Sequence, residues 1–346
     1  MLFSTLNRSL SGIFLFCAFA VSSPFEKNLD LDRHTTRQTD AAPVGYLGAF
    51  FLGNVPNVFL YLSNGNDPLS FRPLRDGQPS IVPTLGTQGV RDPTIVNSGG
   101  ADEGQKWYII GTDLNIAKTT WDAAQRTGSL SIFVWESEDL VNWGKERLVK
   151  VEDDTAGMVW APEAIWDSEQ GQYLVYWSSR FYQTSDPGHT GTPSSSRIRY
   201  AYTSDFSTFS EPQDYVDHSP NNIIDLTFLP NGGNTYARLI KDEDAKTVFS
   251  EFSENGLFGT WERQGGSSGI IAEGVEGPAA YWDNEVGGKA HLLLDFYGGN
   301  GYVPFESSYV PGGQWTRSDA PGFPTGLRHG SVIQIHQEQY DALNSL

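Results

Sequence analysis

The sequence has almost no sulfur. Its only cysteine among 346 residues is Cys17, and methionine occurs only twice. One thiol cannot close a disulfide within the chain, and it rules out the cysteine clusters that hold structural zinc. A hydrophobic core must therefore stabilise the fold, and a chain of this length can bury one without crosslinks.

Positive charge is scarce as well. The 23 Lys and Arg residues face 42 Asp and Glu residues, and the formal net charge is −19. With no basic patch, such a chain is a poor partner for nucleic acid or an anionic membrane. No glycine-rich phosphate loop opens a helix, so nothing indicates nucleotide chemistry. The acidity is typical of a soluble extracellular protein.

Long hydrophobic runs are also missing, apart from a short one near the N-terminus. This run extends over residues 10–21, follows Arg8 and includes the sequence AFA at 18–20, a pattern that signal peptidases cleave. It is too short to span a bilayer as an ordinary helix. The run therefore predicts a signal peptide over residues 1–20 and a secreted, extracellular protein.

The rest of the chain divides into two parts. Residues 21–43 are polar and lack periodicity, which predicts a flexible leader. Residues 44–346 are rich in aromatic residues and glycine, and their apolar runs are short. This pattern is typical of β-strands joined by tight turns, and no segment has the periodicity of a long amphipathic helix. We therefore expect one all-β domain over residues 44–346.

A short unit recurs five times in this domain. It consists of an apolar strand that ends in Ser, a short turn, and then a Trp or Phe. The copies begin at Ser63, Ser137, Ser204, Ser253 and Ser308. Their spacing leaves room for four short strands per unit, and five such units around an axis make a five-bladed β-propeller. A β-sandwich would account for the strands but not for the five-fold recurrence.

The ends of the chain suggest how the propeller closes. The last strand, at 328–335, has no further strands after it, and the strands at 48–52 and 58–62 precede the first complete unit. Pairing of the C-terminal strand with these N-terminal strands would complete a fifth blade. It would also remove two exposed sheet edges.

Polar residues gather in the five segments that should form the innermost strands. These segments are 91–95 (RDPTI), 160–165 (WAPEAI), 223–227 (IIDLT), 275–279 (VEGPA) and 328–331 (RHGS). We expect one side chain from each at equivalent positions around the axis, namely Asp92, Glu163, Asp225, Glu276 and His329. Crowded carboxyls cannot all keep their usual pKa, so some can donate a proton while others activate water. Carboxyl pairs that flank a sugar bond are the usual machinery of glycoside hydrolysis.

The order of these motifs resembles glycoside hydrolase family 43. The resemblance rests on RDP, WAPE, IID, EGP and RHGS together with the SxDLxxW turn, and it covers residues 45–336. That family includes arabinanases, α-L-arabinofuranosidases and β-xylosidases on five-bladed propellers. The resemblance implies that residues 44–346 form the catalytic domain of an inverting glycoside hydrolase.

The resemblance also implies roles for three acids. Asp92 would be the general base that activates water, and Glu276 the general acid that protonates the leaving oxygen. Asp225 would orient the acid and tune its pKa. Inversion needs room for a water between Asp92 and Glu276, so their carboxyls should be about 6.5–9.5 Å apart. The second-blade motif usually ends in Asp, whereas this chain has Glu163 at what is normally a structural or subsite-edge position.

Further substrate contacts are expected around these acids. The residues concerned are Arg91, Trp160, Glu163, Arg238 and His329. Trp160 could stack on a sugar or pack between blades, and Arg238 could bind a hydroxyl or pair with Asp225. The resemblance implies no required cofactor, but it allows a structural calcium at the axis with His329 beside it. The loop at 184–196 could cover the pocket rim or form a plain surface excursion.

Several functions remain open at this point. The resemblance favours α-L-arabinofuranosyl linkages of arabinan or arabinoxylan, with a monomeric enzyme whose only partner is a polysaccharide or oligosaccharide. A β-xylosidase or a galactan-active enzyme of the same family is an alternative. A retaining β-fructosidase-type propeller would use the NDP at 66–68, but Asp67 lies in an outer turn, too close to Asp92 for a separate axial strand. A propeller that binds carbohydrate without hydrolysing it is the remaining alternative.

Overall fold

The computed structural model describes residues 42–266 and 269–346. The predicted signal peptide, with Cys17, and nearly all of the predicted leader lie outside the described residues. Strands dominate the part of the chain that is described. No helix in these two ranges is long and apolar enough to cross a membrane.

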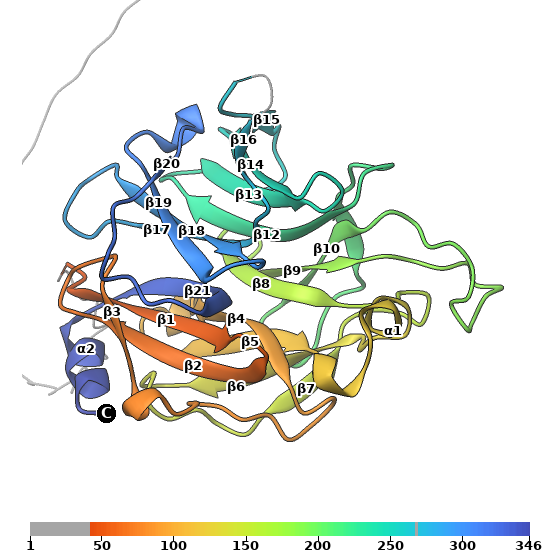
Figure 1. Cartoon of the computed structure of the whole chain (residues 1–346), viewed down its shortest axis with the longest axis horizontal. Coiled ribbons are helices and arrows are strands. Elements are labelled where there is room, and N and C mark those ends of the chain that lie inside the picture. Colours follow the sequence, from red (N-terminus) through yellow and green to blue (C-terminus); the bar gives the residue numbers. More distant parts are fainter. Residues whose placement is uncertain (1–41, 267–268) are drawn as a thin grey trace, which may run out of the picture. The chain divides into compact units, whose positions relative to one another are not determined.

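Four antiparallel sheets follow one another along the chain (Figure 1). Blade I contains β4 (Val90–Asn97), β5 (Trp107–Asp113), β6 (Ser131–Ser137) and β7 (Arg147–Lys150). Blade II contains β8 (Trp160–Asp167), β9 (Gln172–Ser179), β10 (Arg197–Thr203) and β11 (Gln213–Val216). Blade III contains β12 (Ile223–Pro230), β13 (Tyr236–Asp242), β14 (Thr247–Ser253), β15 (Glu262–Arg263) and β16 (Ile270–Glu273). Blade IV contains β17 (Glu276–Trp282), β18 (Ala290–Phe296), β19 (Gly301–Ser307) and β20 (Thr316–Arg317).

A fifth sheet joins the two ends of the described chain. Blade V has the strand order β21 (Leu327–Ile335), β1 (Gly45–Leu52), β2 (Val55–Ser63) and β3 (Phe71–Pro73). Strand β21 pairs antiparallel with β1, with Leu47 opposite Ile333. In Figure 1 the blue β21 lies directly beside the orange β1. The predicted closure is therefore confirmed.

The first strand of each sheet lies at the centre of the ring. Strands β4, β8, β12, β17 and β21 contact one another in a closed circuit, and each begins its sheet. This arrangement confirms the predicted five-bladed β-propeller. The five segments that were expected at the axis all fall in or at the start of these strands.

The recurring turn has a physical explanation. At the end of the third strand a hydroxyl accepts a backbone N–H three residues on: Ser137 Oγ from Leu140 at 2.9 Å, and Thr203 Oγ1 from Phe206 at 3.0 Å. Leu140 and Phe206 both have a positive φ and are fully buried. The unit thus caps a tight turn and inserts one apolar side chain. In blade II the residue that caps the turn is Thr203. The recurring unit was predicted to begin at Ser204, which is one residue late.

Helices are few and short in the described residues. Helix α1 (Trp121–Arg126) lies in the connection between β5 and β6, and α2 (Gln337–Asn344) follows β21. Single 3₁₀ turns occur at Arg75–Gly77, Gly100–Asp102, Ile116–Lys118 and Val310–Gly312. Helix α2 is fastened to blade V, where the Tyr340 hydroxyl donates to the carbonyl of Ser63 at 3.1 Å.

Candidate active site

A β-bulge near the start of each innermost strand builds the site. The register with the second strand shifts after Arg91, Trp160, Ile224 and Glu276, and in blade V it shifts beyond Arg328. A bulge inserts one unpaired residue and re-aims the side chains around it. Because all five bulges fall at the same place, the five strands can be aligned residue by residue.

The alignment gives three tiers around the axis. The upper tier contains Arg91, Trp160, Ile224, Glu276 and Arg328. The bulge tier contains Asp92, Ala161, Asp225, Gly277 and His329. The lower tier contains Thr94, Glu163, Thr227, Ala279 and Ser331. The expectation of five equivalent polar positions is therefore wrong in part, since Glu276 precedes its bulge and Glu163 follows its own by two residues.

The bulge tier brings Asp92, Asp225 and His329 together. Nδ1 of His329 lies 3.4 Å from Oδ1 of Asp92 and 3.9 Å from Oδ2 of Asp225. Burial alone would lower the pKa of this imidazole, but the carboxylates of Asp225 and Asp92 outweigh burial and raise it to about 9. His329 is therefore a cation at neutral pH and sits among acids.

Asp92 is held as an ionised carboxylate. Burial acts to raise its pKa, but the hydrogen bond and charge of His329, with the charge of Arg91, bring the pKa below its usual value. The hydroxyl of Thr112, on the neighbouring β5, donates to the other oxygen, Oδ2, at 2.8 Å. Asp92 also has a φ of 51°, a left-handed conformation that L-residues adopt at a cost. The bulge thus imposes the direction in which this carboxylate points.

Asp225 is more protonated than Asp92. Burial is the main cause of its raised pKa of about 6, and the charges of Glu276 and Asp92 act in the same direction, against His329 and Lys241. Oδ2 of Asp225 accepts the backbone N–H of Gly277 at 3.0 Å. Asp225 therefore responds to the charge of both of the other acids to which the family resemblance gives a catalytic role.

Glu276 is placed between two cations. Nζ of Lys241 donates to Oε2 at 2.9 Å, and the guanidinium of Arg328 lies 3.5 Å from Oε1. Lys241 also pairs with Glu243 at 2.6 Å, and Arg328 pairs with the fully buried Asp295 at 2.7 Å. These contacts hold the carboxyl of Glu276 in one orientation at the start of β17.

Backbone amides of the bulge residues tie blades II, III and V to the blade before each of them. The N–H of Ala161 donates to Thr112 at 2.8 Å, and that of Asp225 donates to Ser178 at 3.2 Å. The N–H of His329 likewise donates to Asp295 at 3.1 Å. Since a bulge residue has no partner within its own sheet, its amide is free to bond across the blade boundary. The site is thereby positioned by neighbouring blades and not by loops.

Glu163 lies deeper in the channel than the other acids. Burial raises its pKa to about 7, and its Oε2 accepts the hydroxyl of Tyr176 at 3.0 Å. It lines a cavity of about 330 Å³ to which all five innermost strands contribute. The remaining lower-tier residues line the same cavity. The carboxyl of Glu163 therefore faces the interior of the channel, and its contact with substrate stays a prediction.

The upper tier carries the aromatic and basic rim of the site. The guanidinium of Arg91 lies 4.3 Å from the ring centre of Phe51 and 5.4 Å from that of Trp121. The ring of Trp121 meets Trp160 edge to face, with centres 6.0 Å apart. Arg91 and Trp160 were expected near the site, whereas Trp121 and Phe51 were not. Nothing in the sequence distinguishes Trp121 from the other nine tryptophans, so sequence reasoning had no signal for it.

Arg238 is directed away from the site. Its guanidinium donates to Glu251 at 2.7 Å and lies 4.2 Å from the ring centre of Trp261. The basic residue of β13 that reaches Glu276 is Lys241, three positions later. Residues an odd number of positions apart on a strand point to opposite faces. The prediction that Arg238 contacts substrate or Asp225 is therefore corrected in favour of Lys241.

The residues at the axis do not fit a directly bound metal ion. In the described ranges, no group of three or more His, Cys, Asp and Glu side chains is placed to hold one. A calcium ion held mostly through water beside His329, which the family resemblance allows, stays a prediction.

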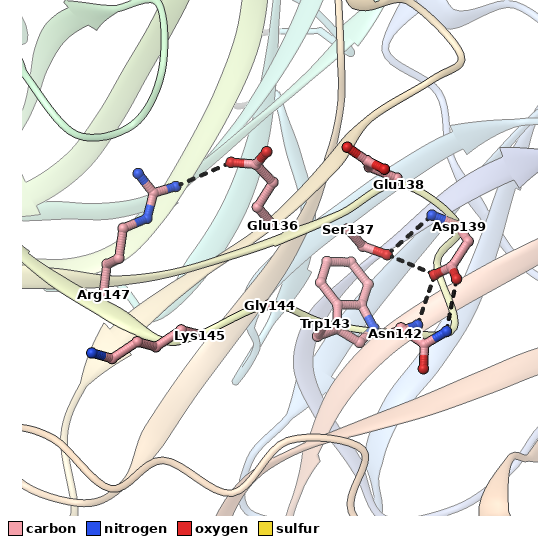
Figure 2. A pocket seen from close by; sticks show the side chains of 9 residues that line it. All are labelled: Glu136, Ser137, Glu138, Asp139, Asn142, Trp143, Gly144, Lys145 and Arg147. Atoms are coloured by element: carbon pink, nitrogen blue, oxygen red, sulfur yellow. Dashed lines mark hydrogen bonds and ion pairs between the residues drawn. The ribbon is translucent and has the colours of Figure 1, made fainter.

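A separate hollow lies on the outside of blade I. It has a volume of about 500 Å³ and is formed by the turn between β6 and β7. Figure 2 shows Ser137, Asp139 and Asn142 bonded to one another within this turn, with Glu136 paired to Arg147 at one side. None of the axial residues lines it, so it belongs to the recurring turn and not to the candidate site.

Comparison with known proteins agrees with this architecture. A family described as a "probable glycosyl hydrolase domain", related to glycoside hydrolase family 43, matches residues 42–341. An α-L-arabinofuranosidase from Bifidobacterium longum subsp. longum is 36% identical over an alignment of 190 residues, and the match covers 51% of this chain and 17% of the relative. The chain thus spans less than a fifth of that longer relative's length.

Two solved structures are similar to this chain at low sequence identity. An α-L-arabinofuranosidase from Fusarium graminearum superposes with a TM-score of 0.51 at 15% identity, over 84% of each chain. An exo-β-1,3-galactanase from Phanerochaete chrysosporium gives a TM-score of 0.47 at 14% identity, over 68% of this chain and 52% of that one. Because the family match covers nearly the whole propeller, the chain belongs to the glycosyl hydrolase domains related to glycoside hydrolase family 43.

Proposed function

We propose that the protein is a secreted, inverting glycoside hydrolase that cleaves α-L-arabinofuranosyl linkages in plant cell-wall polysaccharides or their oligosaccharides. One observation supports this most. Asp92 and Asp225 share the bulge tier, with carboxyl oxygens 3.4 and 3.9 Å from Nδ1 of His329, and Glu276 stands one position earlier on its own strand. The site therefore offers an ionised carboxylate, a partly protonated one and an oriented third carboxyl around one axis.

In the proposed reaction, Asp92 accepts a proton from water while the water oxygen bonds to the anomeric carbon. The bond from that carbon to the leaving oxygen breaks, and Glu276 gives this oxygen its proton. Asp92 suits the role of base because His329 keeps its pKa low. Lys241 lies 2.9 Å from Oε2 of Glu276 and Arg328 lies 3.5 Å from Oε1, so both oxygens of this carboxyl are held in place for the proposed proton transfer. The separation of the two carboxyls stays a prediction of the inverting mechanism.

The choice of sugar is supported by the Bifidobacterium relative, which is described as an α-L-arabinofuranosidase. A β-xylosidase or a galactan-active enzyme would use the same three acids, so the substrate must be decided by assay. Secretion is supported by the hydrophobic run near the N-terminus, which lies outside the described residues. We further propose that the enzyme acts as a monomer.

A substrate screen tests the proposal. The purified protein is incubated with arabinan, arabinoxylan, xylan, galactan, a fructan and nitrophenyl α-L-arabinofuranoside, and the released sugars are identified. Arabinose is expected, and proton NMR should show the β-anomer first. Retention of configuration, or release of fructose from a fructan, would favour the hypothesis of a β-fructosidase-type enzyme. Binding to a polysaccharide with no release of any sugar would overturn the enzyme claim.

Variants connect the activity to the site. Asp92→Asn and Glu276→Gln should each lower kcat by about 100- to 10,000-fold, as expected when a general base or acid is lost. Asp67→Asn is the matched control, because Asp67 only accepts the N–H of Leu69 in an outer turn. Equal activity of Glu276→Gln and the unaltered protein would contradict the proposed role of Glu276.

A further inference from the structure

We propose that Trp121, on helix α1, forms a stacking platform for a sugar unit beside the bond that is cleaved. This inference deepens the proposed function and depends on it for the identity of the sugar. It concerns the connection between β5 and β6, where none of the expected site residues lies. It also gives a role to the loop at 184–196, which the sequence left open.

The position of Trp121 makes it available to a ligand. Its side chain is 51% exposed, although large aromatic side chains are usually mostly buried. It touches Arg91 and Trp160, and both belong to the upper tier. Arg91 directly precedes Asp92 on β4. The indole therefore borders the same end of the axis at which the three acids lie.

The chemistry of this rim matches a sugar. An indole offers an apolar face to the C–H groups of a pyranose or furanose ring. A Trp side chain also loses little conformational entropy when it becomes fixed on binding. The guanidinium of Arg91 lies over the indole, 5.4 Å from the ring centre, and has N–H groups suited to sugar hydroxyls. The same guanidinium also lies over the ring of Phe51, 4.3 Å from its centre. A flat apolar face next to fixed donors is the arrangement that a ring with hydroxyls at its edge requires.

Helix α1 is held in place by two other segments, which makes the platform rigid. Arg126, at its C-terminal end, donates to the carbonyls of His189 and Gly191, each at 3.0 Å. The buried imidazole of His189 bonds to the carbonyls of Arg126 and Asp154, the second at 3.0 Å, and it stacks on Tyr182. The loop at 184–196 therefore acts as a brace for α1. Arg126 is a positioning residue, and Trp121 is the residue that touches substrate.

Binding and kinetics with arabinotriose test the platform. Trp121→Ala should raise the dissociation constant about tenfold, the scale of one aromatic contact, and should raise KM more than it lowers kcat. Trp121→Phe should keep most of the affinity, because a phenyl ring retains an apolar face. Tyr309→Ala is the matched control, since Tyr309 is 67% exposed on the outside of blade IV, and it should leave the affinity unchanged.

The brace is tested by a double-mutant cycle. Arg126→Gln should weaken binding of arabinotriose less than Trp121→Ala does, and the double variant should bind no more weakly than Trp121→Ala alone. Fully additive losses would overturn the positioning role of Arg126. Affinity of Trp121→Ala within twofold of the unaltered protein would overturn the platform.

The test separates failure of the platform from failure of the proposed function. Calorimetry in a Glu276→Gln background measures arabinotriose binding without cleavage of the bond, because the proposed general acid is absent. If the unaltered protein releases no sugar but Trp121→Ala still weakens binding, the platform stands and the proposed hydrolase fails. If the unaltered protein hydrolyses arabinotriose and Trp121→Ala binds it equally well, the hydrolase stands and the platform fails.

Discussion

Nδ1 of His329 lies 3.4 Å from Oδ1 of Asp92 on the strand next to it around the axis. The two residues occupy the same bulge position on β21 and β4, the last and first strands to line the axis along the chain. Closure of the propeller therefore does more than remove sheet edges. It brings a cation from the C-terminal strand to the carboxylate that we propose as the general base.

The charge of His329 can be measured directly. Because its pKa is raised to about 9, its imidazole should be protonated at pH 7.5, whereas burial lowers the pKa of His291 and should keep that imidazole neutral. Long-range ¹H–¹⁵N NMR of the two rings in one spectrum distinguishes the states, with His291 as the internal control. Asp92→Asn should lower the pKa of His329, since one of the two nearest carboxylates is lost. A neutral His329 at pH 7.5 would contradict the charge balance described for the axis.

The same shift has a consequence for stability. A histidine with a folded-state pKa above its unfolded value of about 6.5 contributes stability that is fully present below pH 6.5 and is lost as pH rises through about 9. The contribution corresponds to about 3 kcal/mol in the free energy of unfolding. Denaturant titrations between pH 6.5 and 9 should show this decline.

Glu163→Gln should stabilise the protein at alkaline pH. The pKa of Glu163 is raised by burial to about 7, so its folded-state pKa exceeds its unfolded value, and stability is lost as pH rises from about 4.5 through 7. Removal of the ionisable carboxyl should recover about 3 kcal/mol at pH 8 relative to pH 4. Denaturant unfolding at both pH values measures the difference. Glu138→Gln, in an exposed turn, is the control and should show no such pH-dependent gain.

Much of the fold could be predicted because its determinants are local. A hydroxyl that caps a turn, followed by a buried apolar residue, needs only a few neighbouring residues, as at Ser137 and Leu140. Five copies of this turn revealed five blades. The unpaired strand at the C-terminus then revealed how the ring closes.

The site was only partly predictable because its geometry depends on contacts between blades. No residue pattern in the sequence indicates where the bulges fall. The sequence alone therefore could not show that Glu163 and Glu276 lie outside the bulge tier. Arg238 and Lys241 lie on one strand, and only the pairing register shows which of them faces Glu276. Trp121 is positioned by Arg126 and His189, which are far apart in the sequence.

Gly277→Ala should damage both the fold and the activity. The residue has a φ of +54°, and a Cβ there would lie 2.5 Å from Cγ of His329. A left-handed conformation costs a non-glycine residue about 1–2 kcal/mol, and displacement of the imidazole would add to that cost and disturb Asp92. Gly274→Ala is the matched control, since Gly274 has a φ of +70° with open space around its Cβ position. Equal loss of Tm and activity in the two variants would show that the contact with His329 does not matter.

Lys241→Met should reduce activity and shift its pH dependence. Lys241 is 3% exposed and holds Glu276 at 2.9 Å, so its loss leaves Arg328, at 3.5 Å, as the remaining cation beside that carboxyl. Breaking a buried pair from one side costs about 3–5 kcal/mol, which calorimetric unfolding can measure. The charge of Lys241 also lowers the pKa of Asp225. If Asp225 acts as an anion, the acidic limb of the kcat/KM profile should therefore move to higher pH in this variant.

The neighbouring lysine supplies the control for that experiment. Lys246 pairs with Glu243 at 2.6 Å but is about half exposed, and it has no contact with Glu276 among the described residues. Lys246→Met should cost at most about 1 kcal/mol, as exposed ion pairs do, and should leave the pH profile in place. An acidic limb that moves equally in both variants would reflect the general loss of positive charge. A shift confined to Lys241→Met would connect it to the charge of Lys241 beside Asp225 and Glu276, because only that variant removes this charge.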